Sequence, residues 1–259
     1  MTKASGVVAL LTDYGLQDAY AGTLKGALLS ENPAARIVDL THDIPPQDVR
    51  EGSRVLAAAL PYFPDGTVFV AVVDPGVGTD RAILGVETDR HVLLAPDNGL
   101  LGFLHRIRRR VRIAESRYFL KPLSQTFHGR DIFAPVAGRL SRGADLGRFG
   151  PTVTTMKRLP LAEPRVSRDA VEGEVVSIDR FGNLITNIPG TLVPGKVRIT
   201  VGRRTLTRLS RSYEEAPEGR LLALVGSTGH LEISVNRGSA HKTAGVRKGD
   251  RVLVTRSRR

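Results

Sequence analysis

The chain has 259 residues, of which 41% are hydrophobic and 25% are charged, and these values are ordinary for a globular protein. No run of about 18 apolar residues occurs, so the sequence contains no segment of the kind that forms a transmembrane helix. The absence of cysteine excludes disulfides and thiolate chemistry. We therefore expect a soluble, cytoplasmic protein without a secretory signal.

The net charge is strongly basic, at +12, with an isoelectric point near 10.6. Such a balance raises the question of a nucleic acid or another anionic partner. Much of the charge is arginine, in the segment Arg106–Arg112 and in the tail from Arg256 to Arg259. Aromatic residues make up only 5% of the chain, and no DNA- or RNA-binding motif accompanies the basic segment. We therefore expect a solvated basic face and no nucleic-acid partner, and Arg106–Arg112 has no assigned function.

The first half of the chain alternates strand-like and helix-like segments. Compact apolar runs predict strands, apolar residues at helical spacing predict helices, and proline or glycine marks their ends. The expected elements are a strand at Val7–Thr12, a helix at Ala19–Ser30, a strand at Arg36–Leu40, a helix at Val49–Tyr62, a strand at Thr67–Val73 and a hairpin within residues 82–95. This alternation predicts an N-terminal layered α/β domain with a mostly parallel sheet.

The second half carries short alternating runs separated by turn residues, a pattern typical of a small antiparallel sandwich or barrel. The expected strands are Gly173–Asp179, Lys196–Val201, Leu221–Val225, Leu231–Val235 and Arg251–Thr255. We therefore predict a fold of the α/β class, with an N-terminal domain at 1–157, a linker at 158–170 and a smaller C-terminal all-β, barrel-like domain at 171–259.

Polar loops follow three successive strands of the N-terminal half, at Asp13, Asp43 and Asp74. In open α/β sheets, ligands bind beyond the carboxyl ends of the strands. Aspartate and glycine also simply form good turns, which would explain any one of these loops. Three such loops at corresponding positions favour a site.

Three side chains could form a hydrolytic cluster. Asp74 ends a strand, Arg81 follows seven residues later, and His128 lies at a probable helix start. A carboxylate, a guanidinium and an imidazole that converge on one water could activate it. Spacing alone leaves two alternatives open, since Arg81 could be an exposed loop residue and His128 a helix-capping histidine.

Several other kinds of site lack their sequence signals. No dinucleotide or phosphate-binding glycine loop, no serine-hydrolase elbow and no metal-ligand spacing of histidines is present, so we expect no metal. In the second half, the segment Asp179–Asn183 is dense in hydrogen-bonding groups around one aromatic ring. It could hold a flat heterocycle or form an Asx-rich turn.

Taken together, six motifs in sequence order resemble the S-adenosylmethionine (SAM) hydroxide adenosyltransferase family, the hydrolytic relatives of fluorinase and chlorinase. The motifs are Leu11–Gly15, Asp74–Gly78, Pro96–Gly99, Phe127–Asp131, Asp179–Asn183 and Gly226–Glu232. The resemblance covers nearly the whole chain, and the order of the motifs makes it specific.

The resemblance implies that the chain hydrolyses SAM to adenosine and L-methionine, through attack of an activated water or hydroxide at ribose C5′. Asp74, Arg81 and His128 would be the catalytic residues that activate and orient this water. Methionine leaves as a neutral thioether, so no general acid is needed, and neither a metal nor an organic cofactor is required. Family members are homotrimers, in which SAM lies between the N-terminal domain of one subunit and the C-terminal domain of its neighbour.

The resemblance also implies roles for substrate-binding residues. Asp13 would bind both ribose hydroxyls, whereas Asp179 and Ser227 would hold the amino and carboxylate groups of the methionine part. Asn183 would pair with adenine, with Phe181 packed nearby. The full implied set is Asp13, Asp18, Asn98, Asp179, Phe181, Asn183, Ser227, Glu232, Val235 and Arg237. The chain departs from the halogenases at Ile185, where they carry tryptophan.

Two other functions remain open. The first is SAM-dependent halogenation by the same fold, against which Arg81 and His128 argue because the halogenases replace members of this triad. The second is a non-catalytic sensor that binds SAM or adenosine, against which the complete triad argues.

Overall fold

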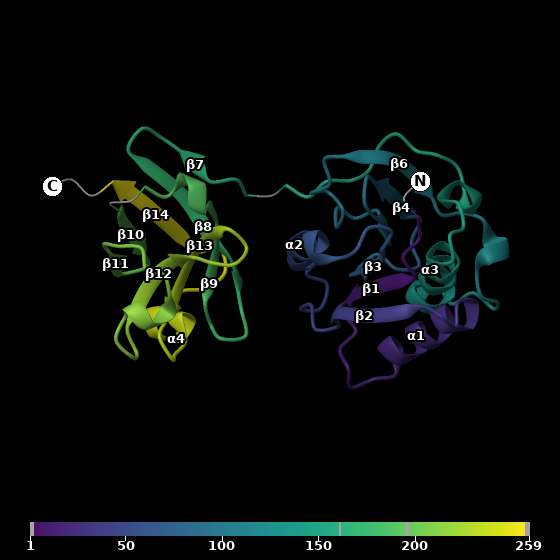
Figure 1. Cartoon of the computed structure of the whole chain (residues 1–259), viewed down its shortest axis with the longest axis horizontal. Helices are drawn as coiled ribbons and strands as arrows, with labels where there is room; N and C mark the ends of the chain where they lie inside the picture. Colours follow the sequence, from purple (N-terminus) through teal and green to yellow (C-terminus); the bar gives the residue numbers. More distant parts are fainter. Residues whose placement is uncertain (1–2, 161, 195–196, 257–259) are drawn as a thin grey trace. The chain divides into compact units, whose positions relative to one another are not determined.

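The computed structural model describes residues 3–160, 162–194 and 197–256. Two compact units divide the chain, Met1–Pro160 and Leu161–Arg259 (Figure 1). The first unit contains helices and a sheet, whereas the second is built mainly from strands. No helix in the described residues is long and apolar enough to cross a membrane.

The first unit alternates strands with helices. Its elements are β1 (Val7–Thr12), α1 (Tyr20–Glu31), β2 (Arg36–Thr41), α2 (Val49–Ala59), η1 (Leu60–Tyr62), β3 (Val68–Val72), β4 (Ile83–Thr88), β5 (Val92–Pro96), β6 (Ile107–Arg112), η2 (Ser116–Tyr118), η3 (Gly129–Phe133), α3 (Ala134–Ser141) and η4 (Leu146–Phe149). The elements expected from the apolar pattern are present, with ends that differ by at most three residues.

The strands of this unit form one mixed sheet, in the order β2-β1-β3-β5-β4-β6. Strands β2, β1, β3 and β5 run parallel, whereas β4 runs antiparallel to both β5 and β6. The short connection at Asp89-Arg90 forces this change, since a tight hairpin joins only antiparallel strands. Three of the five strand pairings are therefore parallel, and the sheet is mixed because both pairings of β4 are antiparallel.

Helices cover both faces of this sheet (Figure 1). Leu24 and Leu28 of α1 pack with α3 against one face, and Leu56 of α2 packs against the other. The central strands β1 and β3 are buried along their whole length, as expected for strands with helices on both faces.

Strand β6 lies within the basic segment Arg106–Arg112, for which the sequence had predicted no element. Three of its arginines have partners within the unit. Arg108 pairs with Asp89 at 2.6 Å, Arg109 bridges Glu87 and Asp145, and Arg110 donates to the carbonyl of Thr154. Much of this basic segment is therefore an edge strand whose guanidinium groups hold neighbouring parts of the same unit.

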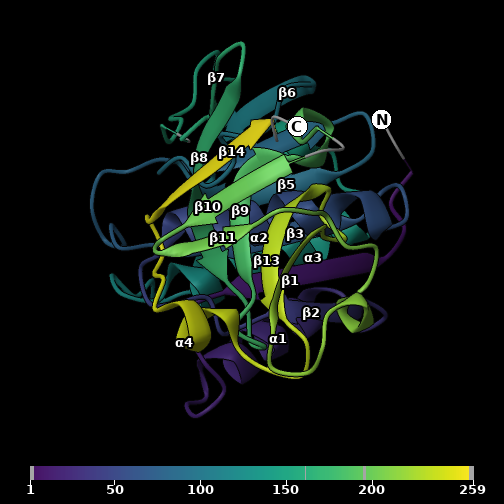
Figure 2. The same ribbon diagram turned by 90° about the vertical axis from the view of Figure 1, so that its left-hand side faces the viewer.

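The second unit is an antiparallel, nearly closed, barrel-like sheet. Its elements are β7 (Arg165–Val166), β8 (Ala170–Ile178), β9 (Leu184–Pro189), η5 (Gly190–Leu192), β10 (Val197–Val201), β11 (Arg204–Leu206), η6 (Tyr213–Glu215), β12 (Leu221–Val225), β13 (His230–Val235), α4 (Ala240–Ala244) and β14 (Arg251–Arg256). The strand order is β11-β10-β14-β8-β9-β13-β12, with β7 beside β8 (Figure 2). Alternate residues of these strands point inward, which explains the period of two in their sequences.

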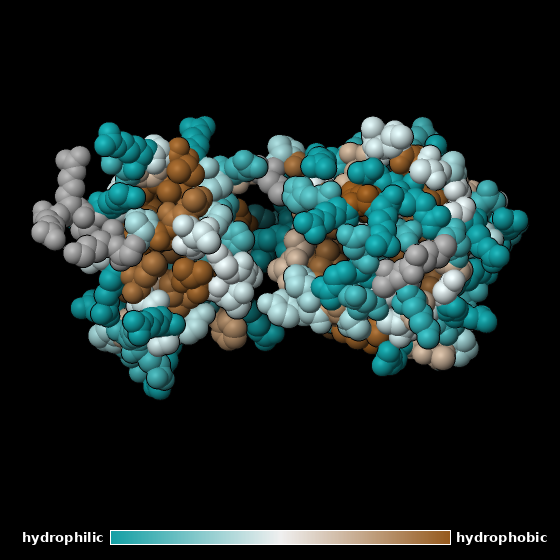
Figure 3. Space-filling view, turned by 45° about the horizontal axis from the view of Figure 1, so that its top comes forward, coloured by the Kyte–Doolittle hydropathy of each residue, from teal (hydrophilic) through white to brown (hydrophobic). Residues whose placement is uncertain are grey.

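The second unit contains three strands that the sequence interpretation did not predict, β7, β9 and β11. Strand β7 lies within residues 158–170, where a linker was expected, and residue 161 and Lys196 lie outside the described residues. Hydrophobic residues also lie on the surface of this unit (Figure 3). The large apolar side chains among them include Val166, which is 61% exposed, and Phe181, which is 75% exposed.

Candidate active site

The carboxyl ends of three parallel strands lie at one edge of the first unit's sheet. Strand β1 lies between β2 and β3, and all three run in the same direction. The loops that begin at Asp13, Asp43 and Asp74 therefore follow neighbouring strand ends, as the sequence predicted. This is the edge at which ligands bind in open α/β sheets.

Asp74, Arg81 and His128 form a continuous hydrogen-bonded cluster. Arg81 Nε lies 2.7 Å from both carboxylate oxygens of Asp74, and Arg81 Nη2 also contacts Asp74 Oδ2. The same Nη2 lies 3.0 Å from Nδ1 of His128. The side chains of Asp74 and Arg81 are only 5% and 7% exposed, and His128 is buried. The structure therefore brings together the three residues for which spacing alone had left alternatives open.

The chemistry of guanidinium fixes the state of His128. Arginine has no acceptor, so Nδ1 of His128 must accept the hydrogen bond from Arg81 with its lone pair. The histidine is then neutral and carries its proton on Nε2. Burial and the adjacent Arg81 charge both lower the pKa of His128, in agreement with this state.

One edge of the Arg81 guanidinium remains available. Its Nε and Nη2 groups serve Asp74 and His128, and its Nη1 has no hydrogen-bond partner in the part of the chain that the structure describes. The N–H groups of Nη1 and the Nε2–H of His128 can therefore donate to a bound water, while Asp74 can accept from it.

A turn of π-helix, η3, begins immediately after His128. Such turns are rare and occur often at functional sites. Asp131 within it is 1% exposed and accepts hydrogen bonds from the backbone of Ser124 and from Arg130. The buried carboxylate therefore ties down the loop that precedes His128, a role that the sequence interpretation had not assigned.

Asp13, expected to bind the ribose, already holds one backbone group. Its Oδ2 accepts the N–H of Gln47 at 2.9 Å, and Gln47 has a positive φ of 66°. A positive φ is costly for a residue other than glycine and indicates that the surrounding structure imposes it. The other oxygen of Asp13 has no hydrogen-bond partner in the described residues.

The remaining two residues expected in this unit lie in different settings. Asp18 is exposed on the loop before α1. Asn98 is half-buried and bonds two backbone groups, donating to the carbonyl of Val73 at 2.8 Å and accepting the N–H of Leu100 at 3.2 Å. Asn98 therefore holds the backbone at Val73, which follows strand β3 and directly precedes Asp74.

A buried polar chain supports the loop that contains Asp13, and the sequence interpretation missed it. Thr12 Oγ1 lies 2.8 Å from Nδ1 of His42, and Nε2 of His42 lies 3.2 Å from Asp39, which pairs with Lys25. Thr12 Oγ1 also accepts the backbone N–H of Tyr14. The polar residues that end β1 and follow β2, Thr12 and His42, are the signal that could have indicated this network.

In the second unit, three of the expected ligands form one compact turn. Asp179 Oδ1 accepts the backbone N–H groups of Phe181 and Asn183, and Asp179 Oδ2 accepts the side-chain amide of Asn183, all at 2.9 Å. Phe181 is 75% exposed at the tip of this turn. The segment is thus an Asx-type turn with an exposed aromatic ring, whereas Asn183 is buried and its amide donates to Asp179.

Ser227 and Glu232 belong to the β12–β13 hairpin. Ser227 is exposed at its turn, whereas Glu232 is buried and accepts hydrogen bonds from Tyr213 Oη and Ser234 Oγ, each at 2.8 Å. Glu232 lies so close to Gly226 that a Cβ atom at position 226 would collide with its carboxylate. Burial and the bond to Glu232 raise the pKa of Tyr213 to about 12.

Val235 and Arg237 end the same hairpin. Val235 is buried in the core of the unit, and a bridge pairs its backbone with Gly238. Arg237 has a positive φ of 53° and pairs with Glu218 at 3.4 Å. This tight backbone turn leaves Arg237 exposed.

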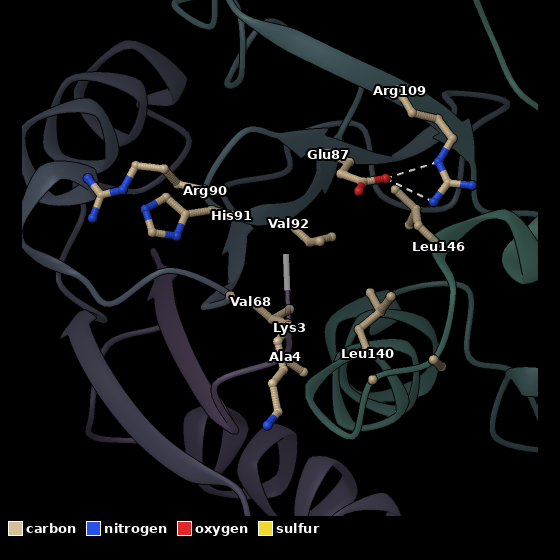
Figure 4. A pocket seen from close by; sticks show the side chains of 13 residues that line it. Lys3, Ala4, Val68, Glu87, Arg90, His91, Val92, Arg109, Leu140 and Leu146 are labelled. Carbon is tan, nitrogen blue, oxygen red and sulfur yellow. Dashed lines mark hydrogen bonds and ion pairs between the residues drawn. The ribbon is translucent and has the colours of Figure 1, made fainter. Parts of the chain in front are cut away.

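A cavity of about 240 Å³ in the first unit lies apart from these residues (Figure 4). Val68 and Val92 line it, and each is the first residue of its strand, whereas Asp74 lies beyond the opposite end of β3. Leu140 of α3 and the Glu87–Arg109 pair also line it. The cavity therefore has no part in the cluster around Arg81.

In the described residues, no group of three or more histidine, aspartate or glutamate side chains could hold a metal ion.

The fold and the two residue clusters together define a class of protein. It combines a layered α/β unit, which carries a buried Asp-Arg-His cluster at the carboxyl edge of its sheet, with a barrel-like β unit that presents an Asp-Phe-Asn turn. The model of the SAM hydroxide adenosyltransferase N-terminal domain matches residues 8–150, and that of the C-terminal domain matches residues 173–253. The chain belongs to the SAM hydroxide adenosyltransferase family.

Individual relatives agree with this assignment. The (R)-S-adenosyl-L-methionine hydrolase of Salinispora tropica is 42% identical, over 96% of this chain and 97% of its own. The enzyme of the same name from Thermus thermophilus is 42% identical over 93% and 96%. A solved structure of a conserved protein from Thermotoga maritima, 38% identical, superposes with a TM-score of 0.91 over 96% of this chain and all of its own. A fluorinase from Nocardia brasiliensis is 26% identical, over 98% and 99% of the two chains.

Proposed function

We propose that this chain hydrolyses SAM to adenosine and L-methionine. The oxygen of a water molecule attacks ribose C5′, the C5′–sulfur bond breaks, and its electron pair stays on sulfur to give a neutral thioether. One proton of the water is released, and the other remains in the new 5′-hydroxyl. The observation that carries this proposal is the buried Asp74–Arg81–His128 cluster, with its free Arg81 Nη1 edge.

Within the cluster we assign the proton-accepting role to Asp74. The lone pair of His128 Nδ1 is bonded to Arg81, so the imidazole offers a donor to the water and no acceptor. Arg81 is a donor only, and its positive charge favours hydroxide character in the water. Asp74 is then the one member that can accept the proton, while Arg81 and His128 stabilise the oxygen.

The names of the hydrolase relatives suggest which stereoisomer is the substrate. Their names specify the (R) epimer at the sulfonium. We propose the same preference here, with the methionine part held by Asp179 and Ser227 and the adenine part by Asn183 and Phe181. Asp13, Asp18 and Asn98 of the first unit and Glu232, Val235 and Arg237 of the second complete the proposed binding set, and no metal or organic cofactor takes part.

We further propose a homotrimer with SAM bound at subunit interfaces. The proposed binding residues are divided between the two compact units, which is compatible with a site that neighbouring subunits complete. Exposed apolar side chains such as Phe181 support a partner surface. Placement in the cytoplasm and the absence of a nucleic-acid partner stay predictions from the sequence.

Incubation with separated (R) and (S) epimers of SAM in oxygen-18 water, without chloride, tests the reaction. We expect adenosine carrying the heavy oxygen together with equimolar methionine, and faster conversion of the (R) epimer. Mass spectrometry measures both products. Binding of SAM without turnover would instead support the sensor, and 5′-halogenated adenosine formed on addition of halide would support the halogenase.

A further inference from the structure

The side chain of Tyr14 lies against Gly129, the residue after His128 of the cluster, and has no assigned role. It directly follows Asp13 in the loop after β1, and neither the proposed mechanism nor the proposed binding set uses it. Two sets of contacts determine where its ring and its hydroxyl lie.

The ring of Tyr14 is fixed from several sides. Its backbone N–H donates to Thr12 Oγ1, at 3.3 Å, and Thr12 is itself bonded to the buried His42. The rings of Tyr14 and Phe127 meet edge to face, with their centroids 5.7 Å apart. The ring of Tyr20 is tilted against that of Tyr14, with a centroid distance of 6.2 Å. A ring held in this way has little rotational freedom, so its hydroxyl has a defined position.

The hydroxyl of Tyr14 lies against Gly129, the residue after His128. A Cβ atom at position 129 would collide with Tyr14 Oη and come within 3.2 Å of the ring carbon that carries it. Glycine is therefore required here by the close approach of the phenol. The contact places the Tyr14 hydroxyl next to the backbone that carries the triad histidine.

The electrostatic surroundings agree with this placement. Burial raises the pKa of Tyr14 far above its ordinary value, the charges of Asp13 and Asp74 raise it further, and Arg81 opposes them. The phenol therefore stays protonated and lies within the field of both carboxylates. No hydrogen-bond partner of the hydroxyl is present in the described residues, so the group remains free to bind a ligand.

We propose that Tyr14 is a further catalytic residue, whose hydroxyl oxygen accepts the second hydrogen bond of the attacking water. The inference rests on the proposed hydrolysis. The water carries two protons, and within the triad only Asp74 offers an acceptor, because Arg81 and His128 act as donors. One proton passes to Asp74, and the other, which remains in the 5′-hydroxyl of adenosine, points to Tyr14 Oη. This pair of bonds directs the lone pair of the water toward C5′.

Steady-state kinetics of Tyr14→Phe, which removes only the hydroxyl, tests the role. We expect kcat to fall about 10–100-fold, with KM changed less than about twofold, since the lost bond acts on the water and not on SAM. Tyr118→Phe is the matched control, because Tyr118 packs in the same core against Phe149 and should keep the wild-type kcat. A Tyr14→Phe enzyme with wild-type kcat would overturn the inference and leave the hydrolysis intact. A wild-type protein that converts neither SAM epimer would overturn both.

A double-mutant comparison tests the placement without relying on turnover. Gly129→Ala should lower the melting temperature clearly in the wild type, where the new methyl group meets the Tyr14 hydroxyl. The same substitution in a Tyr14→Phe background should lower it less, because the colliding oxygen is gone. Equal losses in both backgrounds would show that the hydroxyl does not lie against Gly129, and the inference would fall.

Discussion

At the scale of single residues, the hydrogen-bond pattern determines chemical roles that residue types leave open. His128 could serve as base, acid or orienting group, and its contact with the Arg81 guanidinium selects the neutral form with a proton on Nε2. Asn98, which belongs to the proposed binding set, also holds backbone groups with both ends of its amide. In both cases the hydrogen-bond partner specifies a role that the residue type alone leaves open.

We predict that His128 titrates below the ordinary histidine value of about 6.5. Burial and Arg81 lower its folded-state pKa, so the unfolded chain binds more protons than the folded protein just below pH 6.5. The stabilisation from His128 is complete above pH ~6.5 and is lost as the pH falls through the lowered folded pKa. Activity should decline on this acid limb, since a protonated ring cannot accept from Arg81. NMR titration of the imidazole measures the pKa, and a value at or above 6.5 would contradict the neutral state.

Asn98→Ala should lower both stability and kcat. The substitution leaves the Val73 carbonyl and the Leu100 N–H without their partner, which typically costs about 1–3 kcal/mol for buried groups. The end of β3 then loosens next to Asp74. Chemical denaturation and steady-state kinetics measure the two effects. Unchanged stability would show that these two bonds do not hold the backbone next to Asp74, and a raised KM alone would then leave Asn98 with only its proposed role as a ligand of SAM.

At the scale of elements, β6 shows how a basic segment can be structural. Its arginines alternate between the two sides of an edge strand, and Arg109 reaches both Glu87 on β4 and Asp145 before η4. Arg109 lowers the pKa of Asp145 through this contact. Charged residues on an edge strand also discourage pairing with other chains. The positive charge of the segment therefore needs no nucleic-acid partner to explain it.

Arg109→Met should destabilise the protein, whereas Arg112→Met in the same strand should not. Loss of Arg109 leaves Glu87, which is 8% exposed, without its ion pair, and we expect a loss of about 1–3 kcal/mol in the free energy of unfolding. Arg112 is exposed, so its change should remain within about 0.5 kcal/mol. Urea denaturation of both variants provides the measurement. Equal stability of the two variants would remove the structural explanation of the segment.

At the scale of the whole molecule, the expected ligands of SAM are divided between two compact units with separate cores. The triad and Asp13 belong to the first unit, whereas the Asp179–Asn183 turn and Ser227 belong to the second. Neither unit contains the complete proposed site. The proposed function therefore includes the homotrimer, in which neighbouring subunits would complete the site.

We predict a particle of three times the 28.0 kDa chain mass, measured by size-exclusion chromatography with light scattering.

Phe181→Asp replaces an exposed aromatic ring of the proposed binding surface with a charged carboxylate. We expect the KM for SAM to rise at least about tenfold while the first unit keeps its fold. Circular dichroism provides the control for folding. A monomeric wild-type protein with full activity would exclude a site shared between subunits.

The sequence by itself determined the order of the elements and which strand ends carry polar loops, because apolar periodicity and turn residues are local properties of the chain. The resemblance of six ordered motifs indicated the family, which the comparisons confirm. Tertiary structure alone decided three further points. Sheet pairing turned a basic run into strand β6, contact between the loops before β4 and η3 brought Arg81 to His128, and close packing set the Tyr14 hydroxyl against Gly129. Each of these depends on contacts between residues far apart in the chain, which local pattern cannot specify.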